Sequence, residues 1–360
     1  MRIFAVVRKM LMKRCVLPEQ IIFFVTNRCN LRCNHCLNYS NANKDLSEPR
    51  LDEIKKILES LAPFSLGVIT GGEPFLRDDL PEIAELFRLN GKVLRLDIIT
   101  NGFDFEKIMF LSNRIFDKVR DIPILIQVSI DGPEHIHNRI RNHKDSYRNV
   151  LKTLKGLQRL RDIYHNLRIG VISTITAWNE NELDQIIHFI LNRYSPDTYG
   201  INLLRGQVPL PELKNININN YIRSYNIIFS YFNNRAEKKL FSKIFSSYKS
   251  LLARNVERVY RNHTTLFPCY AGKLICVIDS LLNVRPCEVL EVNMGNLREF
   301  NYNFKKLWFS AKSEEVRGMI KKNNCTCTHE CFLQINMLFN LKWIIKILLR
   351  FIINMIKQKS

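Results

Sequence analysis

The chain has 360 residues, enough for one large domain and a smaller one, and 46% of them are hydrophobic, which excludes a disordered chain. Its formal net charge is +20, because 54 Lys and Arg residues stand against 34 Asp and Glu residues. Such an excess favours anionic partners, namely nucleic acid, a lipid surface or an acidic protein. We assign most of it to a Lys-rich solvated surface and treat the C-terminus separately.

Residues 20–205 alternate between apolar, β-rich runs and amphipathic helical patterns. The predicted strands are Gln20–Thr26, Leu66–Thr70, Leu94–Thr100, Ile124–Ile130, Leu167–Thr174 and Thr198–Leu204. The predicted helices are Leu51–Leu61, Leu80–Leu89, Phe105–Asn113, Tyr147–Arg161 and Glu180–Asn192. A strand and a helix together take up about 30 residues, which predicts an α/β fold with a parallel sheet and right-handed crossovers. The pattern indicates either an incomplete barrel or a doubly wound sheet.

The remaining segments differ in composition from this pattern. Residues 1–19 form a basic N-terminal arm, and residues 206–265 are polar, aromatic-rich and helical, which indicates a connector or a lid. Residues 266–332 are rich in cysteine and contain a predicted hairpin, so we assign them to a small α+β domain. Residues 333–360 are predicted to form a basic amphipathic helix.

Ten cysteines and no recognisable secretory signal indicate a reducing compartment, where clustered cysteines are more often metal ligands or redox groups than disulfides. Cys29, Cys33 and Cys36 directly follow the first predicted strand. A zinc site usually needs four ligands in two separated pairs, whereas three thiolates on one loop suit a four-iron cluster with one open iron. The alternatives are a coincidental cysteine-rich loop or a partial zinc site that includes His35.

Polar or glycine-rich residues stand at the end of every predicted strand. In parallel sheets and barrels, ligand-binding groups collect at these carboxyl ends. Glycine suits a turn at this edge, because the backbone can approach a ligand without a Cβ in the way. After the cysteine loop, the candidates are Gly71-Gly72-Glu73-Pro74, Thr100-Asn101-Gly102, Ser129-Ile130-Asp131-Gly132, Ser173-Thr174 and Arg205.

The cysteine spacing, a gap of three residues and then of two, together with these strand-end residues resembles the radical S-adenosylmethionine (radical SAM) family over residues 20–205. The resemblance implies a partial (β/α)6 barrel in which the catalytic Cys29, Cys33 and Cys36 hold a 4Fe-4S cluster. S-adenosylmethionine would bind the open iron and be cleaved reductively to a 5′-deoxyadenosyl radical, which abstracts hydrogen from the substrate. An external reductant of the flavodoxin or ferredoxin type would supply the electron.

The same resemblance implies which residues contact S-adenosylmethionine. The Gly71-Gly72-Glu73-Pro74 turn would receive the methionine amino group, and Glu73 would pair with the ammonium. Ser129 and Arg141 would contact the carboxylate or the ribose. A turn without a ligand is the alternative for Asp131-Gly132-Pro133. The further candidates for the cofactor site are Asn101, Asp131 and Ser173.

The later cysteines resemble the C-terminal auxiliary-cluster extensions called SPASM and, in shortened form, twitch. The matching pieces are Cys269 with Ala271-Gly272, then Arg285-Pro286-Cys287-Glu288, Gly295-Asn296-Leu297 and the terminal cysteine group. The resemblance implies one auxiliary 4Fe-4S cluster. The implied ligands are Cys269, Cys287 and Cys331, with the fourth from Cys325 or Cys327. A structural zinc knuckle is the alternative, and Cys276 is expected in the core.

The C-terminus combines a narrow basic face with an otherwise apolar helix. No acidic residue follows Glu330, and the polar positions, at gaps of four, four, four and three, are Lys342, Lys346, Arg350, Asn354 and Lys357. A spanning helix is disfavoured, because the central basic residues cost roughly 7–10 kcal/mol against roughly 4–8 kcal/mol gained from the apolar ones. We expect either an interfacial helix on anionic lipid or a helix docked on the protein core.

These patterns predict a radical SAM enzyme with one auxiliary cluster that acts on a peptide, a sugar or a lipid-linked substrate. The alternative is a non-catalytic iron–sulfur or zinc protein that binds a membrane surface or an acidic partner. Nucleic acid is disfavoured, because the aromatic residues are not interleaved with basic ones in a recognisable module. We expect a cytoplasmic protein, with a peripheral position on the inner face of the membrane as an option that depends on the C-terminal helix.

Overall fold

The computed structural model describes residues 16–44, 47–61, 63–235, 240–322 and 326–357. Within these residues, nine strands form one sheet in the order β6-β5-β4-β3-β2-β1-β7-β8-β9. The first six strands are mutually parallel: β1 (Gln20–Thr26), β2 (Leu66–Gly71), β3 (Arg95–Thr100), β4 (Ile124–Ser129), β5 (Leu167–Ile175) and β6 (Thr198–Leu203). The others are β7 (Ile275–Ile278), β8 (Asn283–Arg285) and β9 (Gly295–Asn296).

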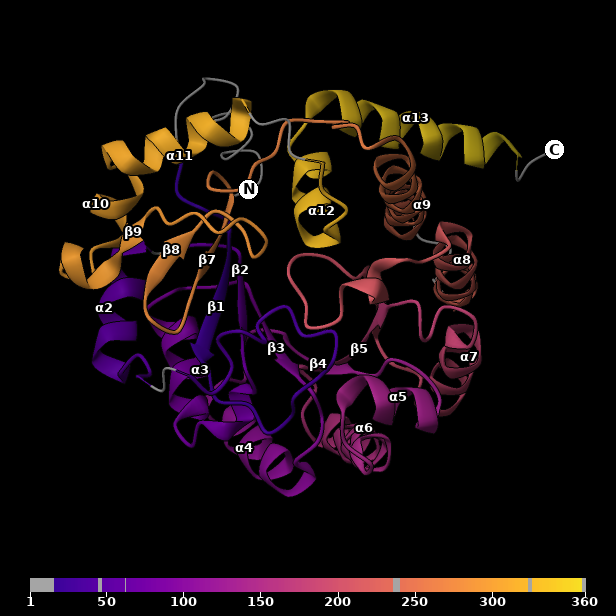
Figure 1. Ribbon diagram of the computed structural model, residues 1–360, viewed down its shortest axis with the longest axis horizontal. Helices are drawn as coiled ribbons and strands as arrows, with labels where there is room; N and C mark the ends of the chain where they lie inside the picture. Colours follow the sequence, from indigo (N-terminus) through magenta and orange to yellow (C-terminus); the bar gives the residue numbers. More distant parts are fainter. Residues whose placement is uncertain (1–15, 45–46, 62, 236–239, 323–325, 358–360) are drawn as a thin grey trace.

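Helices cover the outer face of the curved parallel sheet (Figure 1). The connections between its strands contain α2 (Leu51–Leu61), α3 (Leu80–Leu89), α4 (Phe105–Lys118), α5 (Glu134–Arg141), α6 (Ser146–Ile163) and α7 (Leu183–Tyr194). Each long helix is amphipathic; in α2 the buried apolar side chains Ile54, Ile57, Leu58 and Leu61 recur at helical spacing. The predicted partial (β/α)6 barrel is thereby confirmed, and the doubly wound alternative is not.

Element boundaries follow the sequence prediction closely, with one omission. All six predicted strands are present, and α2 and α3 have the predicted bounds, whereas α4 and α6 run further. The short helix α5 was not predicted, because it is mainly polar and follows Asp131-Gly132-Pro133, a segment that suits a turn as well as a ligand site. Pro133 is in fact the residue before its first turn, and Ile136 and Ile140 anchor its buried face.

The cysteine-rich C-terminal segment joins the barrel sheet through β1. Residues of β1 pair in parallel with β2 on one side and with β7 on the other, and all seven are buried. The predicted hairpin is present, because β8 runs antiparallel to β7, and β9 extends it. The two predicted domains therefore share one sheet.

The connector and C-terminal helices complete the shell. They are α8 (Ile218–Arg235), α9 (Leu240–Asn262), α10 (Phe304–Trp308), α11 (Ala311–Lys322), α12 (Glu330–Leu338) and α13 (Leu341–Lys357). In Figure 1, α12 points toward the middle of the molecule and α13 crosses its upper edge, next to α9. Among the described helices, none alone has the length and apolarity to cross a membrane; α12 and α13 pass that test only together, and they meet at 90°.

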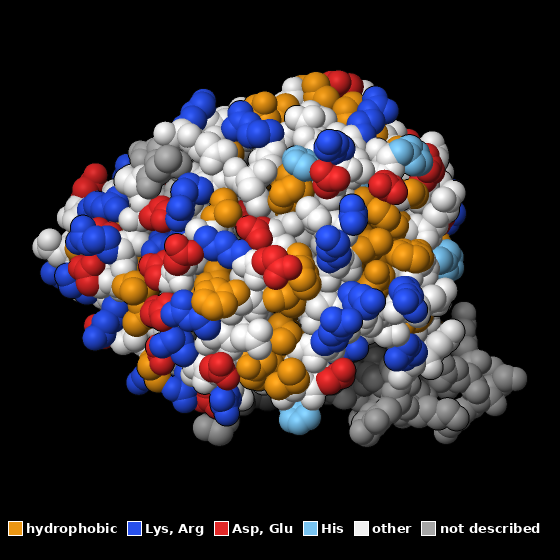
Figure 2. Space-filling view, turned by 90° about the horizontal axis from the view of Figure 1, so that it is seen from below, with side chains coloured by type: hydrophobic (Ala, Val, Ile, Leu, Met, Phe, Trp, Pro, Cys, Tyr) orange, Lys and Arg blue, Asp and Glu red, His pale blue; other side chains and the backbone are white. Residues whose placement is uncertain are grey.

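Charged side chains of both signs are interspersed on the face shown in Figure 2, with apolar side chains between them. Surface pairs such as Arg88–Asp121 at 2.7 Å and Lys118–Glu85 at 3.0 Å tie α3 and α4 to their neighbours. This arrangement agrees with Lys and Arg residues that are spread over a solvated surface. The N-terminal arm lies mostly outside the described residues.

Glu53 on α2 links the barrel to the C-terminal segment and provides a test of this packing. Its buried carboxylate accepts hydrogen bonds from Arg298 Nε at 3.2 Å and from the Tyr302 hydroxyl at 2.8 Å. We predict that Glu53→Gln lowers the free energy of unfolding by about 1–3 kcal/mol, because a buried charged acceptor of hydrogen bonds is replaced with a neutral amide that also has to bury its NH₂ group. Asp52→Asn, at an exposed position one residue away, should have a much smaller effect, because an exposed ion pair contributes little to stability. Urea titration of both variants checks this, and equal effects would contradict it.

Candidate active site

The loop after β1 brings three thiols to one pocket. Cys29, Cys33 and Cys36 line it together with Gly71 and Gly72, which end β2 and begin the following turn. The pocket therefore lies at the carboxyl ends of β1 and β2, where sequence analysis placed it.

Asparagine side chains hold this loop in shape. Asn43 accepts from the Cys29 N–H at 2.9 Å through Oδ1 and donates to the Cys29 carbonyl at 3.0 Å through Nδ2. Asn34 ties the loop to α5 by donating to the Ile140 carbonyl through its backbone N–H and to the Arg139 carbonyl through its amide, both at 2.9 Å. Sequence analysis missed both residues; the only available signal was the abundance of Asn around the cysteines.

Without a positive partner, the thiolate form of these three cysteines is unfavourable. Burial raises the pKa of Cys29 to about 12 and that of Cys33 to about 11, and it raises the pKa of Cys36 as well. Iron supplies the positive charge that makes buried thiolates favourable, so the donor set fits a bound cluster. Among the described residues, no three His, Cys, Asp or Glu side chains converge on a single ion position. A 4Fe-4S cluster does not need this, because each thiolate binds a different iron atom.

Gly71 and Gly72 let the β2 turn approach the cysteine loop closely. A Cβ on Gly72 would lie 2.0 Å from the Arg28 carbonyl oxygen, and one on Gly71 would lie 2.3 Å from the Thr26 carbonyl oxygen. Gly71 also has a φ of +147°, which disfavours any side chain. The two glycines therefore seat the cysteine loop against the turn, in addition to lining the pocket.

Glu73 is buried and already has donors from its own chain. It accepts hydrogen bonds from the Thr100 hydroxyl at 2.9 Å, from the Asn101 N–H at 2.7 Å and from the Phe75 N–H at 3.2 Å. Burial raises the pKa of Glu73 to about 7 in spite of these donors. Its side chain fixes the end of β3 to the turn, and its predicted contact with a methionine ammonium stays a prediction.

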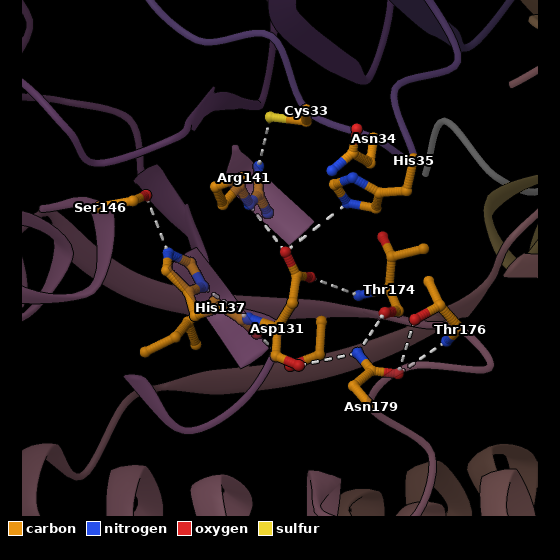
Figure 3. Close-up of polar contacts among 12 residues, drawn as sticks. Cys33, Asn34, His35, Asp131, His137, Arg141, Ser146, Thr174, Thr176 and Asn179 are labelled. Atoms are coloured by element: carbon orange, nitrogen blue, oxygen red, sulfur yellow. Dashed lines mark hydrogen bonds and ion pairs between the residues drawn. The ribbon is translucent and has the colours of Figure 1, made fainter. Parts of the chain in front are cut away.

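Asp131 is the centre of a buried network beside the cysteine loop (Figure 3). Its Oδ2 lies 2.7 Å from Arg141 Nε and 3.6 Å from His35 Nε2, and its Oδ1 accepts from the Thr174 N–H at 2.9 Å. Arg141 Nη1 in turn lies 4.0 Å from Cys33 Sγ. The network thus connects α5 and the ends of β4 and β5 to one of the thiols.

Charge compensation explains this arrangement. Burial, the largest influence, works to raise the pKa of Asp131, but Arg141 together with the neighbouring imidazoles and the Thr174 N–H holds that pKa below its usual value. Burial lowers the pKa of His35 to about 4, so the ring is neutral at pH 7. Arg141 Nη1 faces Cys33, and the positive charge of the guanidinium favours a thiolate there.

The other predicted contacts differ in position. Asn101 donates to Asn30 on the cysteine loop at 2.8 Å. Ser129 ends β4, half-buried. The Ser173 hydroxyl bonds the Ile130 carbonyl at 2.5 Å and the Tyr199 hydroxyl at 2.9 Å, so it is engaged inside the barrel.

Four later cysteines gather in a second region, where each is half-buried. Cys269, Cys287 and Cys331 pack against an apolar cluster that includes Phe24 of β1. Burial raises the pKa of Cys327 to about 12, and nearby charge on Cys269 and Cys287 adds to this effect, so these thiols are neighbours. Backbone N–H groups point at three of the sulfurs: Ala271 to Cys269 at 3.5 Å, Leu290 to Cys287 at 3.3 Å and His329 to Cys327 at 3.2 Å. Cys325 lies outside the described residues.

Arg205 connects the barrel to this second region. It follows β6, and its Nη2 lies 3.2 Å from His329 Nε2, which also contacts Glu288. Its Nη1 donates to the Leu203 carbonyl at 3.1 Å, and its Nε has no hydrogen-bond partner among the described residues.

Comparison with known proteins agrees with this geometry. Residues 23–190 match the family model described as the Radical SAM superfamily. The chain is 26% identical over 324 residues to the AdoMet-dependent heme synthase of Methanosarcina barkeri, a match that covers 84% of this chain and 87% of that protein. The chain belongs to the radical SAM superfamily. It is also 30% identical over 176 residues to Fe-coproporphyrin III synthase of the same organism, which covers 47% of this chain and only 40% of that protein.

Solved structures show the same radical SAM fold. SuiB from Streptococcus suis, solved with S-adenosylmethionine bound, superposes with a TM-score of 0.61 at 13% identity, covering 87% of this chain and 70% of that one. Radical SAM proteins bind S-adenosylmethionine and a 4Fe-4S cluster, so the superfamily assignment brings both cofactors to this chain.

The contribution of the buried Asp131–Arg141 pair to the stability of this radical SAM protein can be tested by substitution. Asp131→Asn leaves a buried guanidinium without its counter-charge, which should lower the free energy of unfolding by about 3–5 kcal/mol. Asp121→Asn removes the same kind of carboxylate from an exposed pair with Arg88 and should cost at most about 1 kcal/mol. Urea titration under anaerobic conditions measures both, and an Asp131→Asn effect as small as that of Asp121→Asn would show that the pair is not structural.

Proposed function

We propose that this protein cleaves S-adenosylmethionine at a cluster held by Cys29, Cys33 and Cys36 and abstracts hydrogen from a substrate with the help of one auxiliary cluster. The observation that carries the proposal is the shared pocket of the three thiols and the Gly71-Gly72 turn. When bound, the cluster supplies one electron to the sulfonium, which gives methionine and a 5′-deoxyadenosyl radical.

The chain's own residues orient and shield this chemistry. Gly71 and Gly72 place bare backbone at the pocket, where an amino acid moiety would bind. Arg141 is held by Asp131 beside Cys33, and it would stabilise the cluster thiolate or a carboxylate of the cofactor. The donors around Glu73 keep the edge of β3 fixed while ligands bind.

The second region is proposed to hold the auxiliary cluster. Cys269, Cys287, Cys327 and Cys331 would be its ligands, because they lie together and three of their sulfurs already accept backbone N–H groups, as cluster thiolates often do. Residues 206–265 would form the connector or lid, and residues 266–332 the SPASM/twitch-like domain. The charge interaction of Cys327 with Cys269 and Cys287 supports Cys327 as the fourth ligand in this proposal.

The substrate would lie between the barrel mouth and the auxiliary region. A peptide is the first candidate, because SuiB, which shares the fold, has been solved with its precursor peptide SuiA. An iron porphyrin is the second, because the relative aligned over most of this chain is a heme synthase. A sugar or lipid-linked substrate remains in the proposal. The Nε of Arg205, which has no hydrogen-bond partner among the described residues, would suit a substrate carboxylate. The peptide and the iron porphyrin can be told apart by adding each to the reduced enzyme, as a peptide library or as the porphyrin. The true substrate class should accelerate the release of 5′-deoxyadenosine.

A flavodoxin- or ferredoxin-type protein is the proposed electron donor. The cytoplasmic location, with a peripheral position on the inner face of the membrane, is also a proposal; it rests on the ten cysteines and on the basic C-terminal helix.

The cleavage reaction is tested directly in the full chain. After anaerobic reconstitution with iron and sulfide, the protein reduced with dithionite should release 5′-deoxyadenosine from S-adenosylmethionine. Cys29→Ala should abolish release, because it removes one of three ligands. Cys276→Ala, which alters a buried thiol in β7, should leave it near the wild-type rate. Absence of release from the wild-type protein, with zinc bound instead of iron, would favour the non-catalytic alternative.

The auxiliary ligands are tested by iron content. The reconstituted wild-type protein should bind about eight iron atoms, four in each of two clusters. Cys327→Ala should bind about four, since it loses only the auxiliary cluster, while Cys325→Ala should keep all of them. The reverse result would exchange these two residues in the ligand set, and about four irons in the wild-type protein would rule out an auxiliary cluster.

A further inference from the structure

Helix α13 has two apolar faces, and the protein covers only one of them. Trp343 and Ile347 are buried, and the Trp343 ring packs edge-on against Phe267 at 5.3 Å between centroids. α13 also runs along α9. The predicted docking of this helix on the protein core is therefore present, but it uses only this face.

The opposite face is exposed and apolar. Successive residues of a helix are 100° apart, so the side chains opposite Trp343 and Ile347 recur at gaps of three and four. All of these are large hydrophobic residues with 44–56% of their surface exposed: Leu341, Ile345, Leu348, Leu349 and Ile352. Scattered exposed apolar residues are common, but a continuous helical face of them marks an interaction surface.

Basic side chains border this face on one flank. Lys342 and Lys346 are exposed and lie between the apolar face and the buried one, and Arg350 continues the same row. No acidic residue follows Glu330 in the sequence. An apolar face with cations along its edge is the pattern of a helix that lies in the headgroup region of an anionic bilayer.

We propose that α13 docks the protein flat on an anionic lipid bilayer through the face formed by Leu341, Ile345, Leu348, Leu349 and Ile352. Charge selects this occupant. A second copy of the chain would bring another row of cations to the same surface, whereas anionic headgroups neutralise Lys342 and Lys346. The proposal does not depend on S-adenosylmethionine cleavage.

Docking in this way fixes the orientation of the auxiliary region. α12 meets α13 at 90° and runs from it toward the middle of the molecule (Figure 1), so it points away from the membrane when α13 lies flat on its exposed face. The nine residues of α12 begin with Glu330 and Cys331 and span about 14 Å at the rise of an α-helix. Cys331, at the far end of α12, would therefore lie about that far above the plane of α13, within reach of the polar part of a membrane-anchored substrate.

The test is sedimentation of the full-length protein with vesicles. Wild-type protein should sediment with vesicles that contain phosphatidylglycerol and much less with pure phosphatidylcholine. The triple variant Ile345→Gln, Leu349→Gln and Ile352→Gln should bind at least about tenfold more weakly, because it removes the apolar face without adding charge. The matched control changes three equally exposed apolar residues elsewhere, Leu94→Gln, Phe110→Gln and Ile163→Gln, and should bind like the wild type.

Two results would overturn the proposal. The first is equal vesicle binding by the α13 variant and the wild type. The second is a wild-type dimer in solution that the α13 variant converts to a monomer, with no vesicle binding, which would assign the face to a second copy. Release of 5′-deoxyadenosine by the α13 variant at the wild-type rate shows that the variant is folded. Because this reaction is measured without vesicles, a failure of membrane docking can be told apart from a failure of the proposed reaction.

Discussion

The position of β1 in the middle of the sheet is the constraint on which the rest of the structure depends. All seven of its residues are buried, because it pairs in parallel with β2 on one side and with β7 on the other. Its carboxyl end leads directly into the cysteine loop, and β7 carries the C-terminal segment with the later cysteines. A single buried strand thereby fixes the first thiol group, the glycine turn after β2 and the second thiol group relative to one another. Substrate would have to fit between two groups that the sheet holds at a set separation.

Burial of ionisable groups follows one logic throughout the molecule. The thiols of Cys29, Cys33 and Cys327 all have pKa values raised by burial, so at each position a free thiolate is unfavourable without a positive partner. The protein adds partial compensation in two ways: a guanidinium held by Asp131 in the first region, and backbone N–H groups in the second. Such charged and dipolar neighbours are the means by which a protein sets the reduction potential of a cluster. The two regions therefore offer different surroundings, which suits clusters with different tasks.

Much of the fold could be predicted because apolar runs and helical stripes are local signals; β1, α2 and α3 were placed to the residue. The helix α5 escaped prediction, because a polar helix after Gly132-Pro133 looks like a turn, and its burial depends on partners far away in sequence. In the site, the thiols were proposed from their spacing and the glycines from their place at the end of a strand, whereas the network around Asp131 and the support from Asn43 depend on contacts that only the folded chain creates. Helix α13 shows the same limit: its sequence allowed docking on the core or on lipid, and only the packing of Trp343 showed that one face is used by the protein while the other is free.

The most direct test of the central claim is the electron paramagnetic resonance spectrum of the reduced first cluster in the Cys287→Ala variant, recorded with and without S-adenosylmethionine. This variant lacks a proposed auxiliary ligand, so the signal reports only the cluster on Cys29, Cys33 and Cys36. Binding of S-adenosylmethionine to the open iron predicts a clear change in the spectrum on addition of the cofactor. A reduced cluster whose spectrum stays the same at saturating S-adenosylmethionine would contradict the account.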